Sequence, residues 1–496
     1  MEITALRCSL TYSQVARLLA LIAIAGSVYF VGLGRAGFDD AEAYSAFIAS
    51  RATIAEVYET SLQLDPGKGG GLYVALLHFY CEFFGTGEIA MRAFSAAFAL
   101  AGVILLYALA SELFEADTAL IATALWAFNP IALIVARWAR MYSMFIALAI
   151  ASLLALVRLQ RRPTMPRAAA FGILGAAMLY IHLGGALMLG AEAAILIRER
   201  WRGRPMFAGN AGLALTLILF LPIAPSAFAE VHSSALGHRF DWMGSASHMP
   251  LAVQIVGASI AIALGFLIVF DPPLRFDKEA EPLRWCLIWT LLPALALLSG
   301  SLLLHPMFEI RYIAPVVAGF AMLAAAGLKF ASARVRNLAT TAVAAAFLIV
   351  AIVFHLYSRP FDLWQNIARA VEASDTPSQD VFFEAGYVMG IRQAQGADPE
   401  SLIEVLPRGY LRIPFDYYFR GTSPRRAINP FRTASARETL AQSARRNRGA
   451  WLVSHMNADD LAAELPPGDE FRCDRIIYDP SVSISLYHIV PRDADH

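Results

Sequence analysis

Residues 90–136 read AMRAFSAAFALAGVILLYALASELFEADTALIATALWAFNPIALIVA, and apolar side chains fill almost all of this stretch. Two runs can be separated, at residues 90–112 and 117–136, with a short polar step between them. An α-helix needs about 20 apolar residues to cross the hydrocarbon core of a bilayer. The stretch therefore predicts two neighbouring membrane-spanning helices joined by a short loop.

Runs of the same kind continue on both sides of this stretch. They lie near residues 13–33, 141–158, 167–183, 184–198, 208–228, 251–270, 284–304, 312–330 and 337–357. The chain as a whole is 58% hydrophobic and 16% charged, which is too apolar for a soluble protein of 496 residues. We therefore predict an α-helical polytopic membrane protein with about eleven transmembrane helices, the first of which is retained rather than cleaved as a signal peptide.

The run at residues 70–84 is shorter than a span and carries His78 and Glu82, so we interpret it as a helix lying along the membrane interface. The positive-inside rule favours this interpretation, because it places all four arginine-rich loops in the cytoplasm. These basic loops lie near residues 158–167, 198–204, 275–284 and 329–336. The N-terminus is then cytoplasmic, and the predicted outer segments are the loops near 35–89, 137–140, 229–250 and 305–311 and the C-terminal domain.

The composition changes after Tyr357. Charged residues, proline and glycine become frequent, and short β-prone runs at 381–383, 451–454 and 482–490 occur together with a helix-like stretch at 459–465. We predict two domains: a transmembrane domain at 1–357 and a small α/β soluble domain at 358–496. The second domain has neither a phosphate-binding glycine loop nor a nucleophile elbow, so a structural or acceptor-docking role is expected.

Charge and cysteine content exclude several classes of function. Lys plus Arg and Asp plus Glu both number 40, so no basic excess indicates a nucleic-acid partner. The four cysteines are scattered and form no CxxC pair. Neither a disulfide framework nor a thiolate metal site is predicted.

Three carboxylates stand together in the first outer loop, at Asp39, Asp40 and Glu42. A half-buried carboxylate at the interface could act as a general base toward an acceptor hydroxyl. The alternative is a helix cap, in which Asp39 or Asp40 binds free N–H groups of a helix starting near Ala41 while Glu42 favours its dipole. Both interpretations stay open, and one residue could serve both roles.

Basic residues are predicted in the other outer segments. Arg137 and Arg140 lie in the second outer loop, and Arg311 lies at the outer end of a later span. Guanidinium groups bind phosphate oxygens in a bidentate way, which suits a lipid-phosphate headgroup. Equally, these arginines could reach lipid headgroups or pair with the three acids. Lys68 could add a phosphate contact, and His182 is a secondary candidate that could instead be an ordinary buried histidine.

Six motifs in this order resemble those of a known family. They are Asp40 to Tyr44, an amphipathic helix at 71–78, Arg92 to Ala96, Trp138 to Tyr142, Tyr180 to His182, and Phe308 to Tyr312. The order is similar to that of bacterial members of the C-type (GT-C) glycosyltransferase superfamily, related to protein O-mannosyltransferases and lipid A aminoarabinose transferases. Two positions depart from the pattern: Ala41 stands where the family usually has Asp, and Trp138 replaces the usual Glu.

The resemblance implies an inverting transfer of a sugar from a polyprenyl-phosphate donor. It implies Asp40 as the base, with Asp39 and Glu42 beside it, and Arg140 and Arg311 as phosphate contacts. Arg137, Lys68, Tyr142, His182 and Tyr312 complete the candidate substrate site. The expected setting is the periplasmic face of a bacterial inner membrane.

The expected partners are the lipid bilayer, the lipid-linked donor, and an acceptor that is lipid A or core saccharide, a polysaccharide or a protein. The acid cluster leaves a divalent cation open as a cofactor. Two other functions compete. A transporter of lipid-linked saccharides would carry ionisable residues within its spans, whereas most spans here are clean. A non-catalytic membrane scaffold is the third hypothesis.

Overall fold

The computed structural model describes most of the helical region and parts of the C-terminal region. The described residues are 11–64, 71–228, 281–303, 310–328, short stretches between 332 and 349, 362–374, 379–384, 411–428, 434–455, 461, 471–479 and 484–492. The chain divides into two compact units. The first comprises residues 1–33 and 49–358, and the second comprises residues 34–48 and 359–496.

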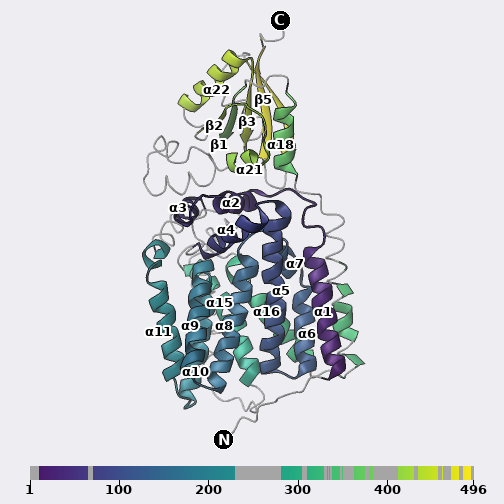
Figure 1. Ribbon diagram of the computed structural model, residues 1–496, viewed down its shortest axis with the longest axis vertical. Helices are drawn as coiled ribbons and strands as arrows, with labels where there is room; N and C mark the ends of the chain where they lie inside the picture. Colours follow the sequence, from purple (N-terminus) through teal and green to yellow (C-terminus); the bar gives the residue numbers. More distant parts are fainter. Residues whose placement is uncertain are drawn as a thin grey trace. The chain divides into compact units, whose positions relative to one another are not determined.

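The first unit is a bundle of apolar helices (Figure 1). Its described helices are α1 (Tyr12–Phe30), α3 (Ile54–Leu64), α4 (Leu72–Phe84), α5 (Glu88–Leu113), α6 (Ala116–Ala127), α7 (Pro130–Ala136), α8 (Tyr142–Arg161), α9 (Met165–Ile181), α10 (Gly185–Trp201), α11 (Phe207–Phe220), α15 (Glu281–Leu303) and α16 (Val316–Leu328), with a 3-10 helix η3 (Ile310–Ile313) before the last. Helix α5 is central, because it packs against α1, α6, α7 and α8.

Four helices in the described part of the chain are long and apolar enough to cross a membrane: α1, α5, α8 and α15. The count rises to five if α6 and α7 form one broken span, and α4, α9, α11 and α16 are shorter apolar helices. Large apolar side chains on the bundle surface are exposed, for example Phe207 and Leu217. The chain is thus a membrane protein with several apolar helices. The predicted run at 251–270 lies outside the described residues, and so does most of 337–357.

The predicted single span at 117–136 is wrong in one respect, because it is broken. Helices α6 and α7 meet at a bend of 60°. Asn129 caps α7 by accepting a hydrogen bond from the Ile131 N–H at 2.9 Å, and Pro130 is the first helical residue. A residue before proline avoids the α conformation, and proline has no N–H to continue a helix. The Asn-Pro pair therefore ends one helix and starts the next.

Small residues let some helices approach closely. Helices α9 and α11 pack side by side, and a Cβ added at Gly172 would lie 2.6 Å from the Gly212 carbonyl oxygen. This is how helices associate in lipid, where close backbone contact replaces hydrophobic burial as the driving force. Within this bundle the Ser152 hydroxyl of α8 donates a hydrogen bond at 2.8 Å to the buried Glu192 carboxylate of α10.

The second unit combines residues 34–48, named here the acidic segment, with the C-terminal region. Its described elements are α2 (Asp40–Ala49, of which the last residue belongs to the first unit), α18 (Leu363–Glu372), β1 (Val381–Glu384), α21 (Arg412–Tyr418), β2 (Arg425–Ile428), α22 (Ala434–Asn447), β3 (Ala450–Ser454), β4 (Phe471–Asp479) and β5 (Ile484–Pro491). The predicted domain boundary at Tyr357 places the acidic segment with the transmembrane domain at 1–357, whereas its contacts group it with residues 359–496.

Five strands of this unit form one mixed sheet in the order β2-β1-β3-β5-β4. Strand β1 is parallel to β2 and β3, and β5 is antiparallel to β3 and β4. Side chains of β1 alternate between two cores: Phe383 packs with α18 and α21, and Phe382 packs with α22. Helices therefore cover both faces, as in an α/β domain. The β-prone runs fall on β1, β3 and β5, and the helix-like stretch at 459–465 lies outside the described residues except for Leu461.

Candidate active site

The three acids of the first outer loop lie at the start of helix α2. The Glu42 N–H donates a hydrogen bond to Asp39 Oδ1 at 2.7 Å, and the Asp39 N–H donates one to Glu42 Oε2 at 3.2 Å. This reciprocal pair is a capping box, in which the cap residue and the third helical residue satisfy each other's backbone donors. The cap interpretation therefore holds for Asp39, and Glu42 is its partner with 2% of its surface exposed.

Asp40 differs from its two neighbours in position. It is the first residue of α2 and is half-buried, and the capping pair is made by the residues on either side of it. Negative charge is favourable in the first turn of a helix, where backbone N–H groups point outward. Of the three predicted acids, Asp40 is the one whose carboxylate the cap does not use.

Arg137 has a structural position in the first unit. Its guanidinium donates hydrogen bonds to the carbonyl oxygens of Val28 at 3.0 Å, Val31 at 2.6 Å and Gly32 at 3.0 Å. Arg92 of α5 donates to the Leu33 carbonyl at 2.8 Å. These carbonyls lie in the last turn of α1 or just after it, where intrahelical donors run out. Both arginines therefore hold the end of α1, a role that the sequence analysis had not assigned to either.

Arg140 lies closer to the interior than Arg137. It is only 2% exposed, and its carbonyl oxygen accepts a hydrogen bond from the Ser95 hydroxyl of α5 at 3.3 Å. Ser95 also lies 3.4 Å from the Tyr73 hydroxyl of α4. The loop after α7 is thus tied to α4 and α5, and it carries a buried cation at the end of the bundle where α5 begins.

Aromatic rings surround His182 at this end of the bundle. The ring centroid of His182 lies 6.0 Å from Tyr142, 5.0 Å from Phe145 and 5.4 Å from Tyr312. Trp138 stacks on Tyr142 at 5.2 Å. The Gly184 N–H donates to His182 Nδ1 at 2.9 Å, which leaves the imidazole proton on Nε2. The structure therefore brings together three predicted site residues, Tyr142, His182 and Tyr312, from α8, the α9–α10 turn and η3.

Two predicted site residues carry no described side chain. Arg311 belongs to η3, beside Tyr312, and only its backbone is described. Lys68 lies outside the described residues. The acids lie in the second unit and the basic and aromatic residues in the first, and each group is described by itself. Their convergence on one face stays a prediction.

The acidic segment has partners that no sequence pattern indicates. The Phe38 N–H donates to the Tyr418 hydroxyl at 2.6 Å, and the Phe38 and Tyr417 rings lie 5.1 Å apart. Residues 38 and 418 are 380 positions apart, and neither tyrosine belongs to a recognisable motif. No local signal could have predicted these contacts.

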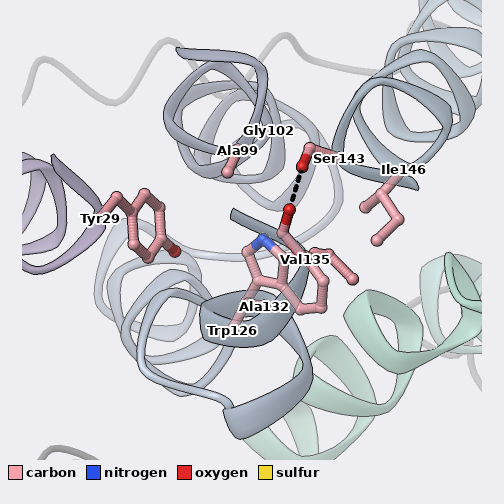
Figure 2. Close-up of a pocket in the computed structure, with 8 residues that line it drawn as sticks. All are labelled: Tyr29, Ala99, Gly102, Trp126, Ala132, Val135, Ser143 and Ile146. Carbon is pink, nitrogen blue, oxygen red and sulfur yellow. Dashed lines mark hydrogen bonds between the residues drawn. The ribbon is translucent and has the colours of Figure 1, made fainter. Parts of the chain in front are cut away.

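A small pocket lies within the first unit at the break between α6 and α7. Figure 2 shows residues that line it, with Tyr29 at one side and Trp126 next to Ala132. The Ser143 hydroxyl donates to the Val135 carbonyl at 2.6 Å, and the Tyr29 hydroxyl donates to the Ala127 carbonyl at 2.8 Å. The two hydroxyls thus donate hydrogen bonds to backbone carbonyls on either side of the helix break. None of the predicted site residues lines this pocket.

Within the described ranges, no group of three or more His, Cys, Asp or Glu side chains is arranged to hold a metal ion. Asp39 and Glu42 are committed to the helix cap, so the described part of the acidic segment offers only Asp40 as a carboxylate outside it. Because oxygen ligands from other loops could contribute, the divalent cation stays a prediction.

Part of the first unit matches a known protein family. The family model described as dolichyl-phosphate-mannose-protein mannosyltransferase matches residues 71–225, which include α4 to α11. By sequence, no curated protein matches the chain.

Solved structures match over nearly the whole length. ArnT from Cupriavidus metallidurans in the apo state has a TM-score of 0.54 at 13% identity, covering 96% of this chain and 98% of that chain. ArnT bound to undecaprenyl phosphate gives 0.54 at 14% identity, covering 97% and 99%. The oligosaccharyltransferase of Archaeoglobus fulgidus with zinc and sulfate gives 0.52 at 15% identity, covering 95% and 72%. The family model thus matches the part of the first unit from α4 to α11, and the solved structures show that the chain shares the fold of these membrane glycosyltransferases.

Proposed function

We propose that the protein transfers a sugar from a polyprenyl-phosphate-linked donor to an acceptor hydroxyl, with inversion at the anomeric carbon. The observation that carries this proposal is the start of α2. Asp39 and Glu42 form the capping pair, and Asp40 is the half-buried first residue of the helix that they cap. The family-model match over residues 71–225 and the shared fold support the reaction class, and the undecaprenyl phosphate bound to ArnT supports a lipid-phosphate donor.

In the proposed reaction, the acceptor oxygen attacks the anomeric carbon while the bond from that carbon to the phosphate oxygen breaks. The electron pair of the broken bond stays on the lipid phosphate, and the acceptor proton passes to Asp40. General base assistance of this kind contributes roughly 10²- to 10⁴-fold to the rate. A single displacement from the opposite side accounts for inversion.

The leaving lipid phosphate needs positive charge close to it. Arg140 and Arg311 are the proposed phosphate contacts, with Lys68 and Arg137 as further basic residues. Arg140 is favoured by its burial, because a fixed cation in a dry site stabilises developing negative charge more than an exposed one. Arg137 is less favoured, since its guanidinium already binds three carbonyl oxygens. Tyr142, His182 and Tyr312 form a cluster of rings, largely buried, which we assign to the wall of the site for the sugar or the first isoprene unit.

The proposed setting is the periplasmic face of a bacterial inner membrane, with a cytoplasmic N-terminus. The acceptor is lipid A or core saccharide, a polysaccharide or a protein, and the sugar is a hexose or a pentose. A divalent cation belongs to this proposal only as an addition to the basic residues, because the steps above assign charge stabilisation to arginine.

The test is transfer of labelled sugar from polyprenyl-phosphate donors in membranes that contain the protein. We expect Asp40→Asn to lose at least 10²-fold in kcat while the donor still binds. Asp39→Ser is the matched control, since serine can cap the helix without offering a carboxylate, and it should keep most of the activity. Full activity in Asp40→Asn would refute the base assignment. Absence of transfer from every donor, with translocation of lipid-linked saccharide intact, would favour the transporter.

A further inference from the structure

We propose that the C-terminal region positions the acidic segment, and that Tyr418 and Asp362 are positioning residues for Asp40. This inference rests on the proposed function for its kinetic consequence. Its structural basis is separate, because residues 34–48 form one compact unit with residues 359–496. The candidate base is therefore built into the soluble unit rather than into the helical bundle.

Two backbone N–H groups just before the helix cap are bound by this region. The Phe38 N–H donates to the Tyr418 hydroxyl at 2.6 Å, and the Gly37 N–H donates to Asp362 Oδ1 at 3.4 Å. Phe38 is fully buried, and its ring contacts Tyr417 at a centroid distance of 5.1 Å. Together, a side chain and two successive amides fix the path of the chain into α2.

The residues that hold the segment are themselves held. Tyr418 ends α21, and Asp416 on the same helix forms ion pairs with Arg412 at 3.1 Å and with Arg425 of β2 at 3.0 Å. Phe415 stacks on Phe419 at 4.6 Å. Helix α21 is therefore anchored to the sheet, and this anchoring holds the Tyr418 hydroxyl at its end in a defined position.

Asp362 stands where a helix cap would be expected. It precedes α18 as the cap residue, yet its side chain makes no capping hydrogen bond. Its carboxylate binds the Gly37 N–H instead. Aspartate is strongly preferred as a cap, so its use on a distant amide indicates that holding the acidic segment takes the place of capping α18.

Position matters because a base must lie within hydrogen-bond reach of the proton it removes. Asp40 is two residues beyond Phe38, at the first position of the helix that the held amides precede. A shift of about 1 Å in a reacting group can cost 10²-fold in rate. Loss of the Tyr418 hydroxyl should therefore reduce kcat without changing the groups that bind the donor.

The experiment compares Tyr418→Phe, Asp362→Ala and Asp362→Asn in the full-length protein in detergent or nanodiscs. Tyr478→Phe, on the exposed surface of β4, is the matched control because it removes the same hydroxyl from the same unit. Two readouts are used: hydrogen exchange at the Phe38 and Gly37 amides, and kcat and KM for the polyprenyl-phosphate donor.

We expect Tyr418→Phe to speed exchange at the Phe38 amide and to lower kcat about tenfold or more, with the donor KM unchanged. Asp362→Ala should do the same at Gly37, and Asp362→Asn should recover most of the loss because its amide oxygen also accepts. Unchanged exchange would overturn the contact, and faster exchange with normal kcat would overturn the positioning role. If the wild-type protein transfers no sugar, the proposed function fails, and the exchange data alone still decide whether the region holds the segment.

Discussion

At the scale of single residues, Arg137 has a structural role that stands beside its predicted role as a phosphate contact. Its guanidinium binds three carbonyl oxygens at the end of α1. We expect Arg137→Met to destabilise the bundle by about 1–3 kcal/mol, because each carbonyl loses a charged donor in a place with few others. Thermal unfolding in detergent measures this change.

The control is Arg200→Met at the exposed end of α10, whose side chain takes part in no described contact. It should leave unfolding unchanged. If Arg137→Met instead unfolds like the wild type but binds polyprenyl phosphate less tightly, Arg137 is a phosphate ligand and the structural assignment is wrong.

The acids of the first loop could be interpreted from sequence, but only in part. Asp39 followed three residues later by Glu42 is a capping-box pattern, so the cap could be anticipated alongside the catalytic role. The contact of Phe38 with Tyr418 could not, because long-range pairing leaves no periodicity or local motif in either segment. The capping pattern of the acids could thus be predicted from local sequence, whereas the long-range contacts that hold this segment could not.

At the scale of elements, the turn between α9 and α10 places His182 among its aromatic neighbours. Gly184 is the residue that this turn requires, since a Cβ there would meet the Tyr312 carbonyl oxygen and His182 Nδ1. We expect Gly184→Ala to cost about 1–3 kcal/mol of stability and to weaken binding of polyprenyl phosphate, because η3 must move away. Thermal unfolding and a lipid-binding assay measure the two effects.

Gly190→Ala, in the middle of α10, is the matched control, because a Cβ there meets nothing within 4 Å. It should be neutral or slightly stabilising, since alanine is the better helix former. Equal behaviour of the two variants would show that the turn tolerates a side chain and does not fix η3.

Elements were predicted best where hydropathy alone defines them. The runs at 13–33, 90–112, 141–158 and 284–304 correspond to α1, α5, α8 and α15. The break between α6 and α7 was missed because a hydropathy window averages over Asn129 and Pro130, although that pair is a local stop signal. Strands β2 and β4 were missed for another reason: both contain several charged residues and lack a continuous apolar run.

At the scale of the whole molecule, the chain consists of an apolar helical bundle and an α/β unit that contains the acidic segment. The positive-inside rule, applied to the basic loops, predicts that the N-terminus lies in the cytoplasm and the α/β unit outside. The proposed reaction requires that orientation, because the donor and Asp40 must lie on the same, periplasmic, side of the membrane. It can be tested with cysteines introduced at exposed positions of the two units.

The labelling background replaces Cys8, Cys81, Cys286 and Cys473 with serine. Among these, burial raises the pKa of the Cys473 thiol to about 11, with Asp474 adding to the shift, so this thiol would react slowly and blur the signal if kept. We expect a membrane-impermeant maleimide to label Tyr478→Cys in cells whose inner membrane is intact. Arg200→Cys, at the basic end of α10, should be labelled only after that membrane is permeabilised. The opposite pattern would place the α/β unit in the cytoplasm and would remove Asp40 from the periplasmic face, where the proposed reaction needs it.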